Sequence, residues 1–205
     1  RDITETNKNY KKGTVRIIPV VFHVIHTYGD ENISKAQIVD QMRVINEDFS
    51  RTNADASKTR SQFVARAADM EIEFKLARKD PNGNCTEGIT RTYSSLTDGG
   101  DELVKALIRW DYRKYLNIWV IKKIARNATG EGIVLGYATL PYATSSASDG
   151  IVLISSRVGS IGTSSIGNGG RVLTHEIGHW LGLLHPFQDG CGSNCTSTGD
   201  RVCDT

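Results

Sequence analysis

Apolar residues recur along this chain with two different periods, which predict a mixture of strands and helices. Residues 14–28, TVRIIPVVFHVIHTY, are apolar on both alternating faces, as in a strand buried on both sides of a sheet. Pro19 has no N–H to donate, so it predicts an edge position or a break in pairing within that strand. Further extended segments lie at 70–78, 116–124, 132–141 and 149–156, which with the first strand predict about five strands before residue 160, and a short strand is expected at 88–93.

Helical spacing occurs at three places. The segment SKAQIVDQMRVINEDFS has an apolar residue at every third or fourth position and opens with Ser34 as its expected N-cap, which predicts an amphipathic helix over 34–50. A second helix is predicted over 101–115. A third is predicted over 173–181, LTHEIGHWL, with an apolar stripe facing the core. The fold class is therefore α+β, a sheet covered by helices.

Composition and charge exclude several classes of protein. Of the 205 residues, 39% are hydrophobic and 23% are charged, and the net charge is +2 with the signs interspersed. We therefore expect no nucleic-acid partner and no anionic membrane partner, and no apolar run approaches membrane-spanning length. Residues 1–13 are polar and aperiodic, which predicts a flexible leader. A chain that starts at Arg1 without the apolar core of a signal peptide is expected to be a processed or recombinant mature form.

The four cysteines are unevenly distributed. Cys85 stands alone, whereas Cys191, Cys195 and Cys203 lie in the last fifteen residues. Their spacing does not match the paired C-x-x-C of a zinc ribbon. Disulfides in an exported protein are the favoured interpretation, with at least one partner expected beyond Thr205, and they indicate an oxidising compartment.

Three of the five histidines lie within the segment HEIGHWLGLLH. His175 and His179 are four residues apart, so on a helix they are about 40° apart and can converge on one ion. Glu176 lies on the same half of the helix, where it can reach a water on that ion without being a ligand. This H-E-x-x-H pattern supplies two nitrogen ligands and a carboxylate base for zinc chemistry.

The residues after the helix supply a third ligand. Gly182 lies where a helix can end in a left-handed turn, and the turn brings His185 back toward the ion, while Pro186 prevents further helix. No glutamate follows Glu176, which also favours His185 as the third ligand. The alternative is a core helix that carries solvated histidines without a metal.

Two other features have simpler interpretations. His23 and His26 lie on opposite faces of the first strand and are interpreted as structural histidines. The Gly/Ser-rich segment 157–170 precedes the histidine helix as a phosphate-binding loop would, but it matches no phosphate-binding pattern. We interpret it as a mobile surface loop.

H-E-x-x-H-x-x-G-x-x-H is the signature of the metzincin metallopeptidases, and the wider chain resembles their pappalysin family. The resemblance covers about residues 14–205 and implies an upper lobe with a twisted, mostly parallel sheet of about five strands, a backing helix and the active-site helix. Residues 14–182 would form this upper subdomain, and residues 183–205 would begin a lower one. The resemblance is carried by IPVVFHVI, GITRT, LNIWVI, LGYATLP, DGIVL, HPFQDGC and GDRVCDT.

The resemblance implies a secreted zinc endopeptidase that acts on proteins and peptides. Glu176 would activate a zinc-bound water, and family members tend to cleave before arginine or lysine. LGYATLP would be the cleft's edge strand, so that extended substrate pairs with Gly136, Tyr137, Ala138 and Thr139; an ordinary edge strand is the alternative.

In the acidic tail the resemblance implies structural calcium, with Asp200 and Thr205 as ligands; a plain polar loop is the alternative. The family's methionine turn beneath the zinc has no counterpart, because Met42 and Met70 precede the motif. The lower lobe is therefore expected to be incomplete, and a C-terminal fragment is a candidate partner that would complete the active site. A catalytically inert, zinc-stabilised peptide-binding module is the competing interpretation.

Overall fold

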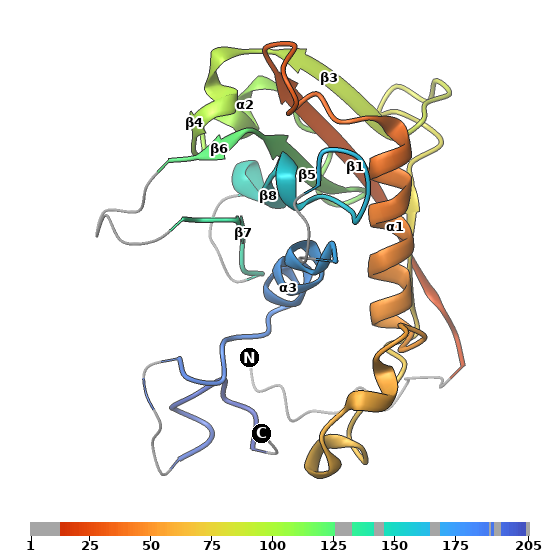
Figure 1. Cartoon of the computed structure of the whole chain (residues 1–205), viewed down its shortest axis with the longest axis vertical. Helices are drawn as coiled ribbons and strands as arrows, with labels where there is room; N and C mark the ends of the chain where they lie inside the picture. Colours follow the sequence, from red (N-terminus) through yellow and green to blue (C-terminus); the bar gives the residue numbers. More distant parts are fainter. Residues whose placement is uncertain are drawn as a thin grey trace.

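The structure is a computed structural model that describes residues 13–125, 133–141, 146–164, 169–188, 190 and 194–203. Apart from Gly13, the predicted leader at 1–13 lies outside these residues. The described ranges contain a main sheet, a small second sheet and three α-helices (Figure 1). This arrangement agrees with the predicted α+β class.

The main sheet has six strands among the described residues and is mostly parallel. Its order is β2–β1–β5–β8–β7, and β3 continues along the β2 side of β1. Only β7 runs antiparallel to its neighbour β8, and it forms one edge of the sheet. The strands are β1 (Arg16–His26), β2 (Ile72–Leu76), β3 (Ile89–Tyr93), β5 (Leu116–Ile121), β7 (Gly136–Ala138) and β8 (Ile151–Ile154). Strands β4 (Asp98–Gly100) and β6 (Lys123–Ile124) pair separately.

Pro19 lies within β1 where one side of the strand is open. The Arg16 and Phe22 N–H groups donate to the β2 and β3 side, so the N–H that Pro19 lacks would face β5. Pairing with β5 begins one residue later, at Val20. The predicted break in pairing is confirmed on that side, although β1 itself is a central strand.

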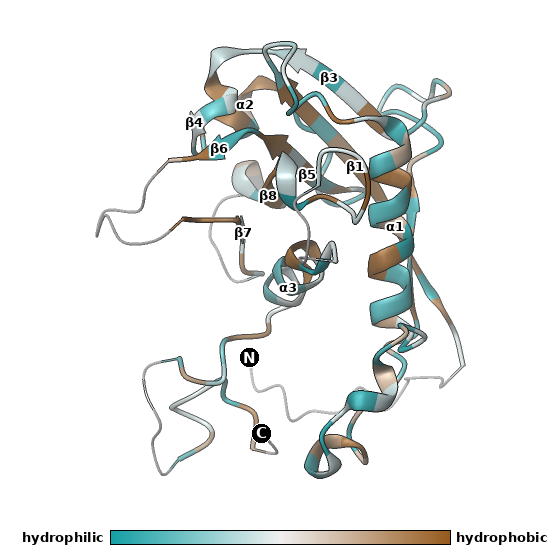
Figure 2. Ribbon diagram, viewed as in Figure 1, coloured by the Kyte–Doolittle hydropathy of each residue, from teal (hydrophilic) through white to brown (hydrophobic). Residues whose placement is uncertain are grey.

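Helices α1 (Lys35–Phe49) and α3 (Arg171–Trp180) pack with the strands around one core. That core includes Phe22, Ile118 and Leu173, which are fully buried. A second core around Trp119 brings together the other side chains of β5 and β8 with helix α2 (Val104–Leu107). Hydrophobic residues dominate β5 and β8, whereas α1 alternates between hydrophobic and hydrophilic turns (Figure 2). Burial on both faces explains why the central strands are continuous apolar runs.

The helix predicted over 101–115 is wrong except for about one turn, because α2 spans only Val104–Leu107. The reason is a contact that is distant in sequence. Asn117 of β5 accepts a hydrogen bond from the Trp110 N–H (2.8 Å) and donates to the Trp110 carbonyl (3.1 Å). These are the backbone groups that a continuing helix would use itself.

The described part of segment 157–170 is fixed against α1, which contradicts its interpretation as a mobile surface loop. Gln41 is fully buried; its side chain accepts from the Gly159 N–H (2.7 Å) and donates to the Gly170 carbonyl (3.0 Å). Gln37, one turn earlier, donates to the Val158 carbonyl (3.0 Å). Two amide side chains of α1 thus hold the segment that leads into α3.

Candidate metal centre and active site

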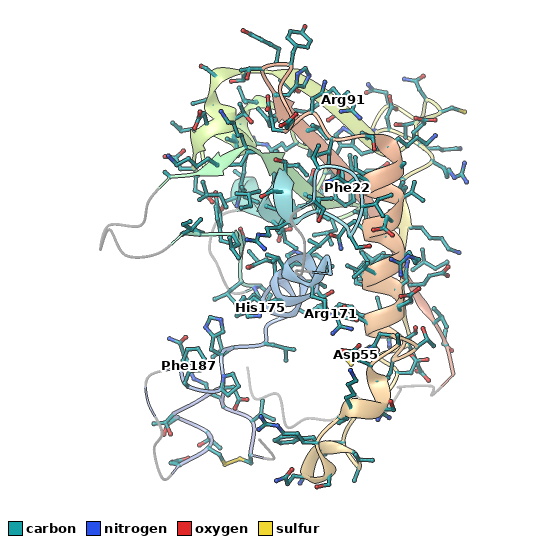
Figure 3. The ribbon with its side chains drawn as sticks, viewed as in Figure 1. Phe22, Asp55, Arg91, Arg171, His175 and Phe187 are labelled. Atoms are coloured by element: carbon teal, nitrogen blue, oxygen red, sulfur yellow. A yellow bond between two sulfur atoms is a disulfide. The ribbon has the colours of Figure 1, made fainter. Side chains whose placement is uncertain are left out.

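Helix α3 is held in place from its first turn. Leu173 and Ile177 are fully buried in the core below it. Arg171 forms a two-pronged ion pair with Asp55, which Figure 3 shows across from α3. The Thr174 hydroxyl donates to Asp48 of α1 (2.7 Å). Apolar packing and these polar contacts fix the direction in which the opposite face of α3 points.

The three predicted histidines converge on one point. The Nε2 atoms of His175, His179 and His185 form a triangle with sides of 3.0, 3.1 and 3.2 Å. In a tetrahedral zinc site with bonds of about 2.0–2.1 Å, neighbouring ligand nitrogens lie about 3.3 Å apart. The triangle therefore fits one zinc ion with a fourth position open. Among the described residues, no other group of three or more potential metal ligands converges in this way.

Contacts around the imidazoles prepare them as neutral ligands. His179 Nδ1 lies 2.8 Å from the Leu183 carbonyl, which can only accept, so Nδ1 carries the proton and Nε2 presents its lone pair. Burial lowers the pKa of His175, and the neighbouring His179 and His185 lower it further. His185 stacks on the Phe187 ring, with centroids 5.0 Å apart. The donor set is thus suited to a metal cation.

The turn after α3 brings in the third histidine, as predicted. Gly182 has a φ of 101°; its N–H donates to the His179 carbonyl (2.8 Å), and the Leu183 N–H donates to the Gly178 carbonyl (2.9 Å). This pair of bonds is the Schellman ending of a helix. Its left-handed residue turns the chain, so that His185 returns over the helix end.

Glu176 is more deeply placed than an outer helix face implies. It is 6% exposed, because β7 covers it: a Cβ added to Gly136 would lie 3.1 Å from Glu176 Cγ. Burial raises the pKa of Glu176 to about 7, with His179 opposing the rise. The absence of a side chain at Gly136 thus allows the close approach of β7 to α3.

Strand β7 and the histidines line the same pocket, which has a volume of about 400 Å³. Gly136 and Ala138 lie on the α3 side of the strand, whereas Tyr137 packs in the second core. Burial, with Glu102 nearby, raises the pKa of Tyr137. Thr139 follows the strand. The four predicted substrate-binding residues therefore lie at the sheet edge beside the histidines, with Tyr137 turned inward. The pocket is lined by Gly136, Tyr137, Ala138, Leu140, His175, Glu176, His179, Leu184, His185 and Gln188.

The acidic tail and the cysteines are only partly described. Asp200 accepts a hydrogen bond from the Val202 N–H (3.0 Å), whereas Thr205 and Cys191 lie outside the described residues. Cys195 and Cys203 form a disulfide, so a disulfide in this region is confirmed. Cys85 is a free, exposed thiol.

The remaining histidines are structural, as interpreted. His23 is fully buried and bonded through both ring nitrogens, to Thr90 (2.7 Å) and Asn117 (2.9 Å). His26 is 5% exposed. Neither belongs to the histidine cluster of α3.

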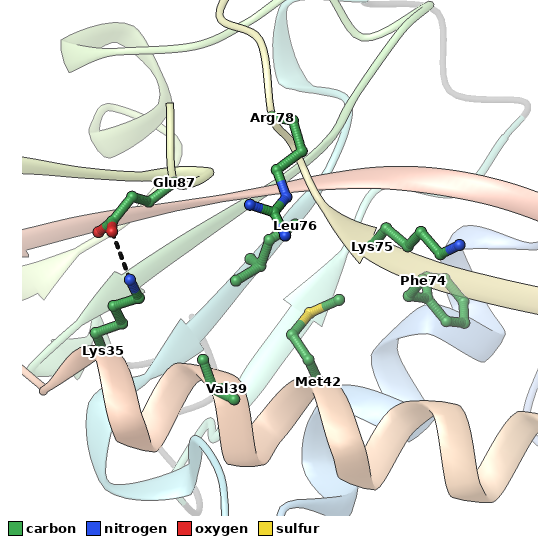
Figure 4. A pocket seen from close by; sticks show the side chains of 8 residues that line it. All are labelled: Lys35, Val39, Met42, Phe74, Lys75, Leu76, Arg78 and Glu87. Atoms are coloured by element: carbon green, nitrogen blue, oxygen red, sulfur yellow. Dashed lines mark hydrogen bonds and ion pairs between the residues drawn. The ribbon is translucent and has the colours of Figure 1, made fainter. Parts of the chain in front are cut away.

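Another hollow, of about 460 Å³, lies between α1 and β2, away from the histidines (Figure 4). Lys35 and Glu87 form an ion pair across its rim. Val39, Met42 and Leu76 contribute its apolar lining. It contains none of the predicted site residues.

The fold and the histidine turn define a class: a metzincin-type metallopeptidase, with an antiparallel edge strand above the H-E-x-x-H helix. Comparison with known proteins supports this. Residues 98–205 match the model of peptidase family M43, described as pregnancy-associated plasma protein-A. An extracellular metalloprotease of Colletotrichum graminicola is 32% identical over 92% of this chain and 56% of its own length. One of Verticillium alfalfae is 30% identical over 99% and 61%.

Solved structures agree. Mature mirolysin of Tannerella forsythia, in complex with a cleaved peptide, is 41% identical with a TM-score of 0.82, covering 95% of this chain and 72% of that one. Promirolysin, as an E225A mutant, gives 40% and 0.81. The chain belongs to the pappalysin family, M43, of metallopeptidases. It spans little more than half the length of the first fungal relative, and no helix among the described residues is long and apolar enough to cross a membrane.

Proposed function

We propose that this chain carries the zinc centre and upper cleft wall of a secreted endopeptidase that hydrolyses peptide bonds. The observation behind the proposal is that three converging Nε2 atoms, the Glu176 carboxylate and the β7 edge strand line one pocket. Residues 14–182 would form the upper subdomain and 183–205 the start of the lower one. The name of its relatives, extracellular metalloprotease, supports secretion.

In this proposal, His175, His179 and His185 hold the zinc ion. When bound, zinc lowers the pKa of a water molecule and polarises the peptide carbonyl. Glu176 takes the proton from the attacking water and delivers it to the leaving amine. Its burial beneath β7 supports this role, because no described side chain donates a hydrogen bond to the carboxylate and its oxygens stay available for a proton.

An extended peptide would pair with the free edge of β7 through backbone hydrogen bonds, a β-augmentation mode. Gly136, Tyr137, Ala138 and Thr139 would supply the backbone partners. The mirolysin structure with a cleaved peptide supports a peptide ligand for this fold.

Three finer parts of the proposal come from the family resemblance. The preferred residue after the scissile bond would be arginine or lysine. Asp200 and Thr205 would contribute oxygen ligands to a structural calcium ion. A C-terminal segment would complete the lower wall of the cleft, which agrees with the greater length of the relatives.

The test is proteolysis of a denatured protein mixture, with and without 1,10-phenanthroline, followed by sequencing of the products. We expect cuts that the chelator abolishes and that precede basic residues. Glu176→Gln should retain one zinc per chain but lose turnover by at least about a hundredfold, the lower end of the usual contribution of a general base. Glu87→Gln, an exposed glutamate on the far hollow, is the control and should cleave normally.

Near-normal activity of Glu176→Gln would refute the role of Glu176. Peptide binding without any chelator-sensitive cut would refute the endopeptidase and favour the inert binding module. Cleavage at bonds that are not followed by arginine or lysine would refute only the proposed preference for a basic residue after the scissile bond.

A further inference from the structure

Lys105 is a lysine buried beneath the edge strand β7. It is 2% exposed, although it carries a charge. Its ammonium donates to the Ser148 carbonyl (2.6 Å), to Glu102 Oε1 (2.9 Å) and to Thr139 Oγ1 (3.1 Å). All three of its N–H donors therefore have oxygen partners, and these come from three different segments of the chain.

The same ammonium also lies against two aromatic rings. Its Nζ is 5.1 Å from the centre of the Tyr137 ring and 5.6 Å from that of Trp119, within the range of cation–π attraction. Tyr137 is the middle residue of β7. Lys105 thus makes two contacts with this strand. It contacts the Tyr137 ring at the centre of β7, and it donates to the Thr139 hydroxyl immediately after the end of β7.

Strand β7 is short and is paired on one edge. It pairs with β8 through three residues. Beside this pairing, the Ile154 N–H donates to the Leu135 carbonyl (3.0 Å), the Thr139 N–H donates to the Gly150 carbonyl (3.0 Å) and the Thr139 hydroxyl donates to the Ser148 carbonyl. Its other edge has no partner among the described strands. Burying an ammonium costs free energy that an apolar side chain of the same size would avoid. Loss of the ammonium would also leave the Ser148 carbonyl without this donor, and the end of β7 would loosen.

The position of β7 decides the shape of the cleft. Gly136 and Ala138 face α3, and a methyl group at Gly136 would lie only 3.1 Å from Glu176 Cγ, so that the neighbouring groups would have to shift. A small shift of the strand would therefore change the distance between its free edge and the histidine cluster.

We infer that Lys105 is a positioning residue, which holds β7 at the distance from α3 at which the strand's free edge can pair with a peptide backbone. The inference rests on the proposed function, because it assumes that β7 binds substrate. Lys105 does not line the histidine pocket and is no ligand or proton carrier.

The test compares two hydroxamate probes on the zinc-loaded chain. Acetohydroxamate reaches only the metal site, whereas a tripeptidyl hydroxamate also extends along β7. In Lys105→Met we expect the tripeptidyl probe to bind about tenfold more weakly, equal to about 1.4 kcal/mol, with unchanged acetohydroxamate affinity and zinc content. Lys105→Arg, which keeps the charge and donors, should lie closer to wild type. Lys122→Met removes an exposed lysine paired with Asp98 and is the matched control.

A second readout needs no metal. Amide hydrogen exchange in the metal-free chain should be faster at residues 136–139 in Lys105→Met and unchanged in α3. If Lys105→Met fails to fold, Glu102→Ala removes one of the three oxygen partners of the ammonium without changing β7 itself, and it should shift both readouts in the same direction.

Equal weakening of both probes, or of neither, would overturn the inference. A wild-type chain that binds both probes but cleaves nothing would refute the proposed activity, and the comparison of the two probes would still decide the role of Lys105.

Discussion

Acidification should destabilise this fold through His23 at a higher pH than that at which carboxylates such as Glu31 and Asp40 respond. The ring is fully buried, with Nδ1 near Thr90 Oγ1 and Nε2 near Asn117 Oδ1. Burial lowers the pKa of His23 from 6.5 to about 4, against a smaller opposing effect of the Asn117 hydrogen bond. Between those values the unfolded chain binds a proton that the folded chain does not, so the free energy of unfolding falls as the pH falls.

The size of the effect follows from the shift. A lowering from 6.5 to about 4 is worth about 3 kcal/mol. About 2 kcal/mol of this is lost between pH 6.5 and 5. Carboxyl groups such as Glu31 and Asp40 have pKa values below their usual range, so their contribution is lost only at lower pH. Glu176 also titrates above pH 5, because burial raises its pKa to about 7. It is present in both proteins compared below, so the difference between them isolates His23.

The assay is urea denaturation of the metal-free chain at pH 7, 6 and 5. Wild type should lose about 2 kcal/mol more than His23→Gln across this interval, because both proteins retain the histidines of α3. His23→Gln is expected to be less stable at pH 7, since it loses ring contacts with Trp119. Equal pH dependence in the two proteins would refute the reasoning, whatever their absolute stabilities.

Two predictions concern the ends of α3. Gly182→Ala forces a side chain onto a backbone with φ of 101°; it should cost about 1–2 kcal/mol of stability and weaken zinc binding by displacing His185, measured by competition with a chromophoric chelator. Gly178→Ala is the control, since its added Cβ meets only Leu183 at 3.6 Å. This variant should keep the zinc affinity of the wild type. Equal zinc affinity in Gly182→Ala and Gly178→Ala would contradict the role of the turn. Asp48→Ala leaves the Thr174 hydroxyl without its acceptor and should lower the free energy of unfolding by about 1–3 kcal/mol, measured by thermal or urea denaturation. Asp48→Asn keeps an acceptor and should lower it by less. Equal losses in the two variants would argue against that hydrogen bond.

Local patterns predicted the convergence of the three histidines well, because these residues lie within eleven positions. The i, i+4 histidine pair and the glycine turn depend on helix geometry alone, and both have the predicted form. The helix predicted over 101–115 failed for the opposite reason. Its apolar spacing resembles that of α1, but Asn117 binds the Trp110 backbone and ends it. No spacing within the segment reveals that contact.

Polar residues at helix positions that face the core are the signal that periodicity arguments overlook. Gln37 and Gln41 lie four residues apart on α1, and both are buried. Each binds backbone groups of the segment that leads into α3. A buried amide one turn from another is costly unless both are bonded, so such a pair on an amphipathic helix predicts a chain segment held against it.

The proposed metal centre and the proposed peptide-binding edge should therefore be separable by mutation. The Nε2 triangle depends on helix α3 and on the turn at Gly182. The distance of β7 from α3 depends instead on Lys105, Thr139 and the pairing with β8. Substitutions at the turn are expected to change zinc affinity, whereas substitutions beneath β7 are expected to change peptide affinity at constant zinc content. Since α3 and β7 approach each other closely where Gly136 passes Glu176, a change at that contact should affect both.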